Sequence, residues 1–188
     1  MDPVADCLAA HDFADIPRDD IFVAALTMLA EVCAFLGDAR RAELLYDLLL
    51  PHESSCVVIG YAIASLGSAA RCLGVLAATM QRWHDAERHF EDAMAMNARI
   101  GARSWLASGQ VDYARMLLAR HASKDHDRAV ALLDEAISSA QQLGMADLVG
   151  KATALKRAAE DHRGRSGAGT ARGPKPKAAP RIHVTGPA

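Results

Sequence analysis

The sequence repeats itself, and this repeat constrains the fold more than any other feature. Three segments align around Ala42, Ala86 and Ala129, so the two spacings between these alanines are 44 and 43 residues. A period of this size is typical of chains built from helix pairs, in which each unit buries its apolar face against its neighbours. The repeat therefore predicts an array of helices and not a sheet protein.

Each repeated segment has the periodicity of an amphipathic helix. In the third segment Ala129, Leu133, Ala136, Ala140 and Leu143 follow one another at steps of 4, 3, 4 and 3 residues. These steps place all five on one stripe of a helix. The composition agrees, because 51% of the residues are apolar and only 5% are aromatic. Such a chain can bury a sizeable core of small and aliphatic side chains.

The repeat also predicts where helices end and how many there are. Gly37, Gly101 and Gly144 stand where a left-handed C-cap is expected. We expect partner helices near 20–36, 57–80, 103–120 and 145–160, which with the three repeated segments makes about seven helices. No stretch alternates at period two, and no Asn-Gly turn signal occurs. Sheet is therefore not expected.

The chain divides into three parts by composition. Residues 1–18 form a lead-in, with Pro17 as an expected helix start, and 19–160 form the repeat domain. Residues 161–188 carry six Lys or Arg against one acid, a net +5, whereas residues 1–160 carry −7. This Gly- and Pro-rich tail has no periodicity and is expected to be disordered.

The sequence favours a cytoplasmic location without membrane contact. The acidic N-terminus lacks the basic and apolar regions of a signal peptide. The most apolar stretch, 56–80, is interrupted by an arginine and three glycines, which suits a buried helix better than a membrane span. The four cysteines, none in a C-x-x-C pair, are expected to be reduced and buried.

One repeat resembles the tetratricopeptide signature. Ala86 and Phe90, with Trp83 before them and Ala93 after, match the second-helix pattern, and Leu73-Gly74 matches the first helix. The resemblance implies a right-handed solenoid, all-α, made of helix pairs. The period is about ten residues longer than the usual one and the terminal proline is missing. Other helical solenoids, such as HEAT-like arrays, therefore remain alternatives.

A closer resemblance covers roughly residues 15–160. The runs 82–90, 101–103 and 112–118 are similar to the C-terminal helical-repeat region of large bacterial signalling ATPases. Some of those proteins carry adenylate or guanylate cyclase domains, and others carry LuxR-type DNA-binding domains, as in the maltose-regulon activator class. The resemblance implies a role in signal transduction or transcriptional regulation. This chain holds the repeat part alone, as a standalone relative or a fragment of a larger regulator.

Motifs for catalysis, cofactors or metals are not found in the sequence. No G-x-x-x-x-G-K-[ST] loop is present, so ATP binding is not carried over from the resemblance. His84 and His89 share a helix face only loosely and are expected to be solvated, and no third ligand converges on them. Asp112 and Arg115 are interpreted as a surface salt bridge along a helix. We therefore expect no enzyme activity, no cofactor and no metal.

The first helices of the three units are expected to line a groove. The lining is predicted to be small and apolar, which favours a hydrophobic or helical protein segment as ligand. Trp83 and Trp105 are both expected in the core, and Trp105 is the one more suited to face this groove. The candidate partner-binding residues are Thr27, Glu31, Ser68, Arg71, Val75, Val111, Leu118 and His121.

These observations predict a non-catalytic protein–protein interaction module, a scaffold of a bacterial regulator. One alternative is a repeat domain that senses a small molecule and controls an ATPase or DNA-binding domain, within the same molecule or in a partner. The other is a truncated fragment of a larger regulator. The tail lacks aromatic side chains for base stacking, so a nucleic-acid partner is not expected.

Overall fold

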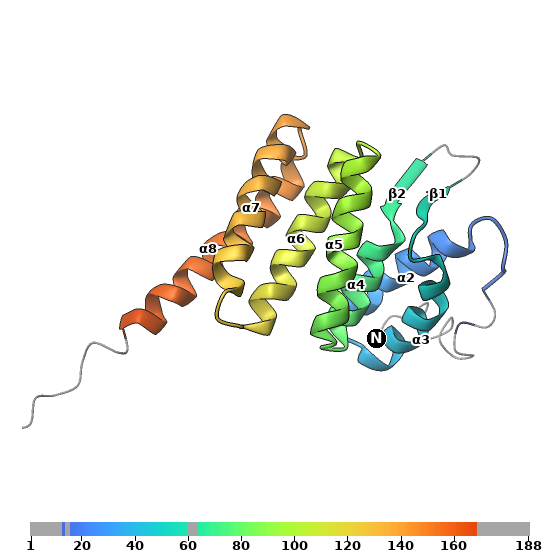
Figure 1. Ribbon diagram of the computed structural model, residues 1–188, viewed down its shortest axis with the longest axis horizontal. Helices are drawn as coiled ribbons and strands as arrows, with labels where there is room; N and C mark the ends of the chain where they lie inside the picture. Colours follow the sequence, from blue (N-terminus) through green and yellow to red (C-terminus); the bar gives the residue numbers. More distant parts are fainter. Residues whose placement is uncertain (1–12, 14–15, 60–63, 169–188) are drawn as a thin grey trace, which may run out of the picture.

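A computed structural model describes residues 13, 16–59 and 64–168 and shows a row of helices (Figure 1). Over these residues the protein is mainly helical, as the periodicity predicts. The described part contains seven α-helices and a short 3-10 helix, η1. They are α2 (Phe22–Leu36), α3 (Ala39–Leu49), η1 (Leu50–His52), α4 (Ala69–Thr79), α5 (Trp83–Arg99), α6 (Arg103–Arg120), α7 (Asp125–Gln142) and α8 (Ala146–Ala168).

Each helix packs against the next one in the chain, from α2 at one end of the row to α8 at the other. A second set of contacts joins α2 to α4, α4 to α6 and α6 to α8. The even-numbered helices therefore form one side of the row. α3, α5 and α7 form the other side.

The repeat alanines lie at the centre of this packing. Ala42, Ala86 and Ala129 are fully buried, on α3, α5 and α7 respectively. The predicted stripe of α7 is buried through Ala140, whereas Leu143, beyond the helix end, is exposed. Alanine has no side chain beyond Cβ, so neighbouring helices can approach closely at these three positions.

Gly74 explains the Leu73-Gly74 pair of the repeat. A Cβ atom added at Gly74 would lie 3.0 Å from the Phe90 ring. The Phe90 ring is itself stacked on Tyr113, with 5.5 Å between the ring centroids. The Phe90 ring therefore has little space to move away from α4. Glycine at position 74 of α4 allows the aromatic residues of α5 and α6 to pack closely against this helix.

The glycines end the helices as expected. Gly37, Gly101 and Gly144 have φ angles of 67°, 70° and 69°, the left-handed conformation. Asp38 caps α3, because its carboxylate accepts a hydrogen bond of 3.0 Å from the Arg41 amide. Asp125 is the first residue of α7, and its carboxylate accepts a hydrogen bond of 2.9 Å from the Ala122 amide.

A β-hairpin corrects the prediction of a helix over 57–80. Strands β1 (Cys56–Ile59) and β2 (Ala64–Ser68) pair antiparallel, and α4 begins only at Ala69. The expectation that the chain has no sheet was therefore wrong. β1 holds two valines and an isoleucine, which favour strands, and Ser68 then caps α4 by accepting from the Ala70 amide at 3.2 Å.

The ends of the helical region can be compared with the expected helix bounds. The first described helix begins at Phe22 and not at Pro17, and Phe13 and Ile16 belong to the core. At the other end α8 continues to Ala168, so the tail does not start at 161. An ion pair of 2.6 Å between Arg163 and Asp127 of α7 helps to hold this extension. The remaining lead-in residues, 1–12 and 14–15, and the tail residues 169–188 lie outside the described residues.

Two features bear on membrane and thiol chemistry. No helix in the described ranges combines the length and the apolar character needed to cross a bilayer. Cys33 and Cys72 are buried as predicted, but Cys56 is exposed on β1. Cys7 lies outside the described residues.

Candidate functional site

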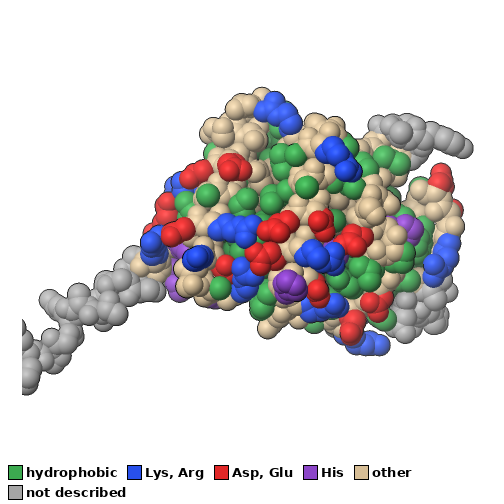
Figure 2. Space-filling view, viewed as in Figure 1, with side chains coloured by type: hydrophobic (Ala, Val, Ile, Leu, Met, Phe, Trp, Pro, Cys, Tyr) green, Lys and Arg blue, Asp and Glu red, His purple; other side chains and the backbone are tan. Residues whose placement is uncertain are grey.

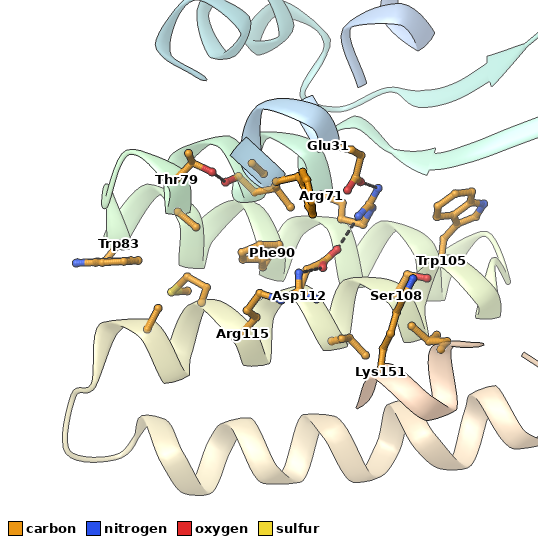
Figure 3. A pocket seen from close by; sticks show the side chains of 18 residues that line it. Glu31, Arg71, Thr79, Trp83, Phe90, Trp105, Ser108, Asp112, Arg115 and Lys151 are labelled. Atoms are coloured by element: carbon orange, nitrogen blue, oxygen red, sulfur yellow. Dashed lines mark hydrogen bonds and ion pairs between the residues drawn. The ribbon is translucent and has the colours of Figure 1, made fainter. Parts of the chain in front are cut away.

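A cavity of about 710 Å³ opens between the even-numbered helices, and α5 contributes to its wall. Figure 3 shows Trp83 at one end of it and Trp105 at the other, with Arg71 and Asp112 between them. The lining residues come from α2, α4, α5, α6 and α8. They are Glu31, Ala34, Phe35, Arg71, Val75, Ala78, Thr79, Trp83, Phe90, Trp105, Ser108, Val111, Asp112, Arg115, Met116, Ala119, Leu148 and Lys151.

Half of the predicted partner-binding residues line this cavity. Glu31, Arg71, Val75 and Val111 do so, and they come from the three helices on which the groove was expected. These four predicted residues therefore lie together on one side of the row.

The other four predicted residues lie elsewhere. Thr27 is buried, and its hydroxyl donates to the Ala24 carbonyl at 2.8 Å. Ser68 caps α4 and lies at a separate depression beside Arg88 and Glu53. Leu118 and His121 line another cavity at the far end of α6. These residues are not brought together with the other four.

A cluster of charged side chains lies in the middle of the main cavity. Arg71 on α4 donates from Nη1 to Oδ2 of Asp112 on α6 at 2.6 Å, and from Nη2 to Glu31 on α2. Asp112 also accepts from Arg115 at 2.9 Å. The predicted pair between Asp112 and Arg115 is confirmed, but it extends into the cavity and includes Arg71.

Arg71 is buried, with 7% of its surface exposed. Burial by itself lowers its pKa, but the neighbouring Cys72 sulfur, Asp112 and Glu31 together raise the pKa above its usual value. Arg71 therefore stays charged, and its guanidinium also lies 5.6 Å from the centroid of the Trp105 ring. Its Nε atom is buried and has no hydrogen-bond partner in the described structure.

Four aromatic side chains form part of the apolar cavity wall, beside aliphatic ones. Trp105 is only half-buried and lines the cavity instead of lying in the core, and its Nε1 donates to the Ser65 carbonyl of β2 at 2.9 Å. Trp83 was expected in the core but is only half-buried and lines the cavity. Phe35 is 89% exposed at the rim. Phe35 therefore adds an exposed apolar side chain to the edge of the cavity.

Several lining residues were missed because the predicted face of α6 is rotated relative to the cavity. Of the predicted α6 residues Val111, Leu118 and His121, Val111 lines the cavity, and the other α6 lining residues include Ser108, Asp112, Arg115 and Ala119. The two stripes differ by one residue, which is about 100° around a helix. The predicted lining was therefore too apolar, and Lys151 of α8 adds a further charge to it.

A second cavity of about 420 Å³ lies where α6 ends against α7 and α8. It is lined by His121, His126 and His162 among others, and the His121 and His162 ring centroids are 6.2 Å apart. His126 already contacts the Ala159 carbonyl at 3.2 Å through Nε2. Its Nδ1 lies 3.3 Å from Arg163. These contacts leave the three rings without a shared centre.

His89 differs from the prediction, because it is fully buried and not solvated. Its Nε2 lies 2.8 Å from the Tyr46 hydroxyl and 3.2 Å from Nη2 of Arg88. Arginine can only donate, so Nε2 acts as an acceptor. Burial, followed by the charge of Arg88, lowers the pKa of His89. His84 is exposed as expected.

Among the described residues, Glu53, His89 and Asp92 form a group whose potential metal-ligating atoms lie within 4.8 Å of one another. Arg88 already supplies a cation there, since it donates to Glu53 and lies 3.6 Å from Asp92. The negative charge of Glu53 and Asp92 is therefore balanced by the guanidinium of Arg88. It is a poor setting for a metal ion, which would have to compete with the guanidinium.

A polar network covers the other side of the row. Figure 2 shows acidic and basic side chains interleaved across the middle of this face. Arg128 of α7 pairs with Glu87 and Glu91 of α5 at 2.8 and 2.6 Å, and Arg120 pairs with Glu87 at 2.7 Å. Hydrogen bonds from Arg120 and Tyr113, opposed by burial, lower the pKa of Glu87. This face holds helices together and has the mixed charge of a solvated surface.

The buried cysteines are poor nucleophiles. Burial raises the pKa of Cys72 to about 11, and burial together with Asp38 raises that of Cys33 to about 11. A thiol with such a pKa is almost entirely protonated at neutral pH. Neither residue brings acyl-transfer or redox chemistry to the main cavity.

No protein-family model, curated protein or solved structure matches this chain.

Proposed function

We propose that the cavity between α2, α4, α6 and α8 binds a segment of another protein, and that the chain is a non-catalytic interaction module. The single observation that carries this proposal is the cavity of about 710 Å³, with aromatic side chains along its wall and Phe35 exposed at its rim. A concave surface that combines aromatic anchors with a few charged groups is typical of protein recognition.

The order of the helices supports a tetratricopeptide-like solenoid as the framework for this module. Helix pairs follow one another along a row, and the first helix of each pair lines the cavity. A solenoid presents its inner helices as an extended binding surface. The sequence resemblance supports a role in bacterial signalling or transcriptional regulation in the cytoplasm.

The size of the cavity supports small-molecule sensing as a second candidate function. A volume of about 710 Å³ lies in the range of about 300–1,000 Å³ that is usual for small-ligand sites. In this alternative a metabolite would occupy the cavity, and the chain would control an ATPase or DNA-binding domain.

A selection of peptides tests the protein-binding proposal. A random dodecapeptide library displayed on phage is selected on the full chain, and the affinity of selected peptides is measured by fluorescence anisotropy. Ala119 is exposed on α6 and lines the cavity, so Ala119→Trp fills the cavity at little cost to folding. We expect this variant to weaken binding about tenfold or more.

The matched control is Ala98→Trp, an exposed position on α5 outside the cavity. It is expected to bind the same peptides as tightly as the unchanged chain. Peptides that bind equally well to Ala119→Trp, or the absence of any binding peptide, would rule out this function of the cavity. A thermal shift with small metabolites would then favour the sensing alternative.

A further inference from the structure

The two carboxylates that hold Arg71 differ in exposure. The Asp112 side chain is 14% exposed and is shared between Arg71 and Arg115, whereas the Glu31 side chain is 51% exposed. Glu31 has Arg71 as its only ion-pair partner in the described structure. An ion pair with one half-exposed member contributes little net free energy, because water competes for it. Glu31 is therefore the partner of Arg71 that is more easily replaced.

The cavity wall carries more positive than negative charge. Arg71, Arg115 and Lys151 line it, against Glu31 and Asp112. Among the residues that the structure describes, Lys151 pairs only with Asp147, at 2.7 Å, and both of these side chains are largely exposed. If Glu31 turned outward, the wall would hold three cations and one acid. The vacated position beside Arg71 would then suit a carboxylate supplied from outside.

We propose that the protein segment that occupies the cavity carries an acidic side chain, which takes the place of Glu31 on Arg71. This inference rests on the proposed function of the cavity. Glu31 then occupies the site as a competitor until the ligand arrives. Asp112 holds Arg71 in place before and after the exchange, so the guanidinium is pre-organised and binding need not order it.

The apolar part of the cavity wall predicts a second feature of the ligand segment, beside its acidic side chain. Trp83 and Phe90 lie on one side of Arg71 (Figure 3), and Met116 also contributes apolar surface to the cavity. The ligand segment is therefore expected to carry an apolar side chain close to the acidic one. The apolar side chain contributes most of the affinity, and the acid determines which segments bind.

Substitution of Glu31 is expected to change the affinity in opposite directions for acidic and basic ligands. An acidic peptide competes with Glu31 for Arg71, whereas a basic peptide would pair with Glu31. The selected peptides that depend on the cavity, shown by their sensitivity to Ala119→Trp, are measured against Glu31→Gln. If an acidic peptide displaces Glu31, this variant removes the competitor and is expected to bind about fivefold more tightly. The same peptides with their Glu or Asp replaced by Gln or Asn should lose both affinity and this gain.

Glu43→Gln is the matched control, because Glu43 is an exposed residue of α3 outside the cavity. It changes the net charge equally and is expected to leave affinity unchanged. Weaker binding by Glu31→Gln would mean that Glu31 contacts a basic ligand, and unchanged binding would mean that Glu31 is not displaced. Either result overturns the inference, and circular dichroism confirms that each variant is folded.

The peptide selection separates this inference from the function on which it rests. Cavity-dependent peptides without an enrichment of acidic residues would overturn the inference alone and leave the proposed function intact. Peptides that are not cavity-dependent, or no peptides at all, would overturn the proposed function and the inference with it.

Discussion

Burial keeps His89 neutral in the folded protein, and this sets a pH limit on stability. The side chain is enclosed between Tyr46 and Arg88, and its pKa is lowered from the ordinary 6.5. Below that pH the unfolded chain binds a proton at His89 that the folded chain does not. Stability is therefore present above about pH 6.5 and is lost as the pH falls.

We predict that the free energy of unfolding falls between pH 7 and pH 5, with a slope of at most about 1.4 kcal/mol per pH unit from this one proton. Denaturant unfolding at several pH values measures it. Carboxylates with lowered pKa, such as Glu87 and Asp125, contribute only near and below their ordinary values of 4.5 and 3.8. His89→Gln should flatten the slope in this window, and His84→Gln should not. Equal slopes for His89→Gln and the unchanged chain would contradict the prediction.

At the scale of secondary-structure elements, the hairpin occupies chain that is helical in the next repeat. α4 has 11 residues and begins 17 residues before Ala86, whereas α6 has 18 and begins 26 residues before Ala129. The spacing from Ala42 to Ala86 is nearly the same as that from Ala86 to Ala129. This is because β1 and β2 take up the length of chain that belongs to the longer helix α6 in the next repeat. A repeat found from its anchor residues therefore predicts the length of a unit, but not that all of it is helical.

The hairpin is fixed to α6 through Gly67 and Trp105. Gly67 has a φ of +78°, and a Cβ added there would lie 2.7 Å from Cγ of Trp105. We predict that Gly67→Ala displaces the indole and lowers the free energy of unfolding by about 1–3 kcal/mol. In a Trp83→Phe background the fluorescence of Trp105 should shift.

Gly37→Ala is the control for this change. Gly37 has a similar φ of +67°, but nothing lies within 4 Å of an added Cβ. This variant should show the backbone strain alone, without a change in fluorescence. If both variants leave the emission of Trp105 unchanged, the indole does not depend on Gly67.

At the scale of the whole molecule, the core could be predicted from the sequence and the cavity only in part. The repeat alanines, Phe90 and Leu133 are buried as the apolar stripes predict, because burial follows directly from helical periodicity. The cavity depends on the rotation of α6, which the same periodicity fixes only to within one residue. The pairing of Arg71 with Glu31 and Asp112 joins residues about 40 apart, and no local pattern predicts such contacts.

Ala86→Asp tests whether the repeat positions hold the molecule together. Ala86 is fully buried on α5, so an aspartate there must lose its hydration without a partner. We predict a loss of about 3–5 kcal/mol in the free energy of unfolding, measured by urea denaturation. Ala98→Asp, exposed on the same helix, should cost less than about 0.5 kcal/mol. If the two variants unfold alike, Ala86 is not a packing position.

Arg71 joins three successive helices on one side of the row, because it lies on α4 and pairs with α2 and α6. On the opposite side Arg128 joins α7 to α5 independently. The guanidinium of Arg71 is therefore one polar link between α2, α4 and α6 on the cavity side, in addition to the packing that joins these helices. Replacing Glu31 on Arg71 would remove the link to α2 and leave the links to α6 and between α5 and α7 in place. Binding of an acidic segment would therefore change the polar contacts at the α2 end of the row and leave those at the α8 end as they are.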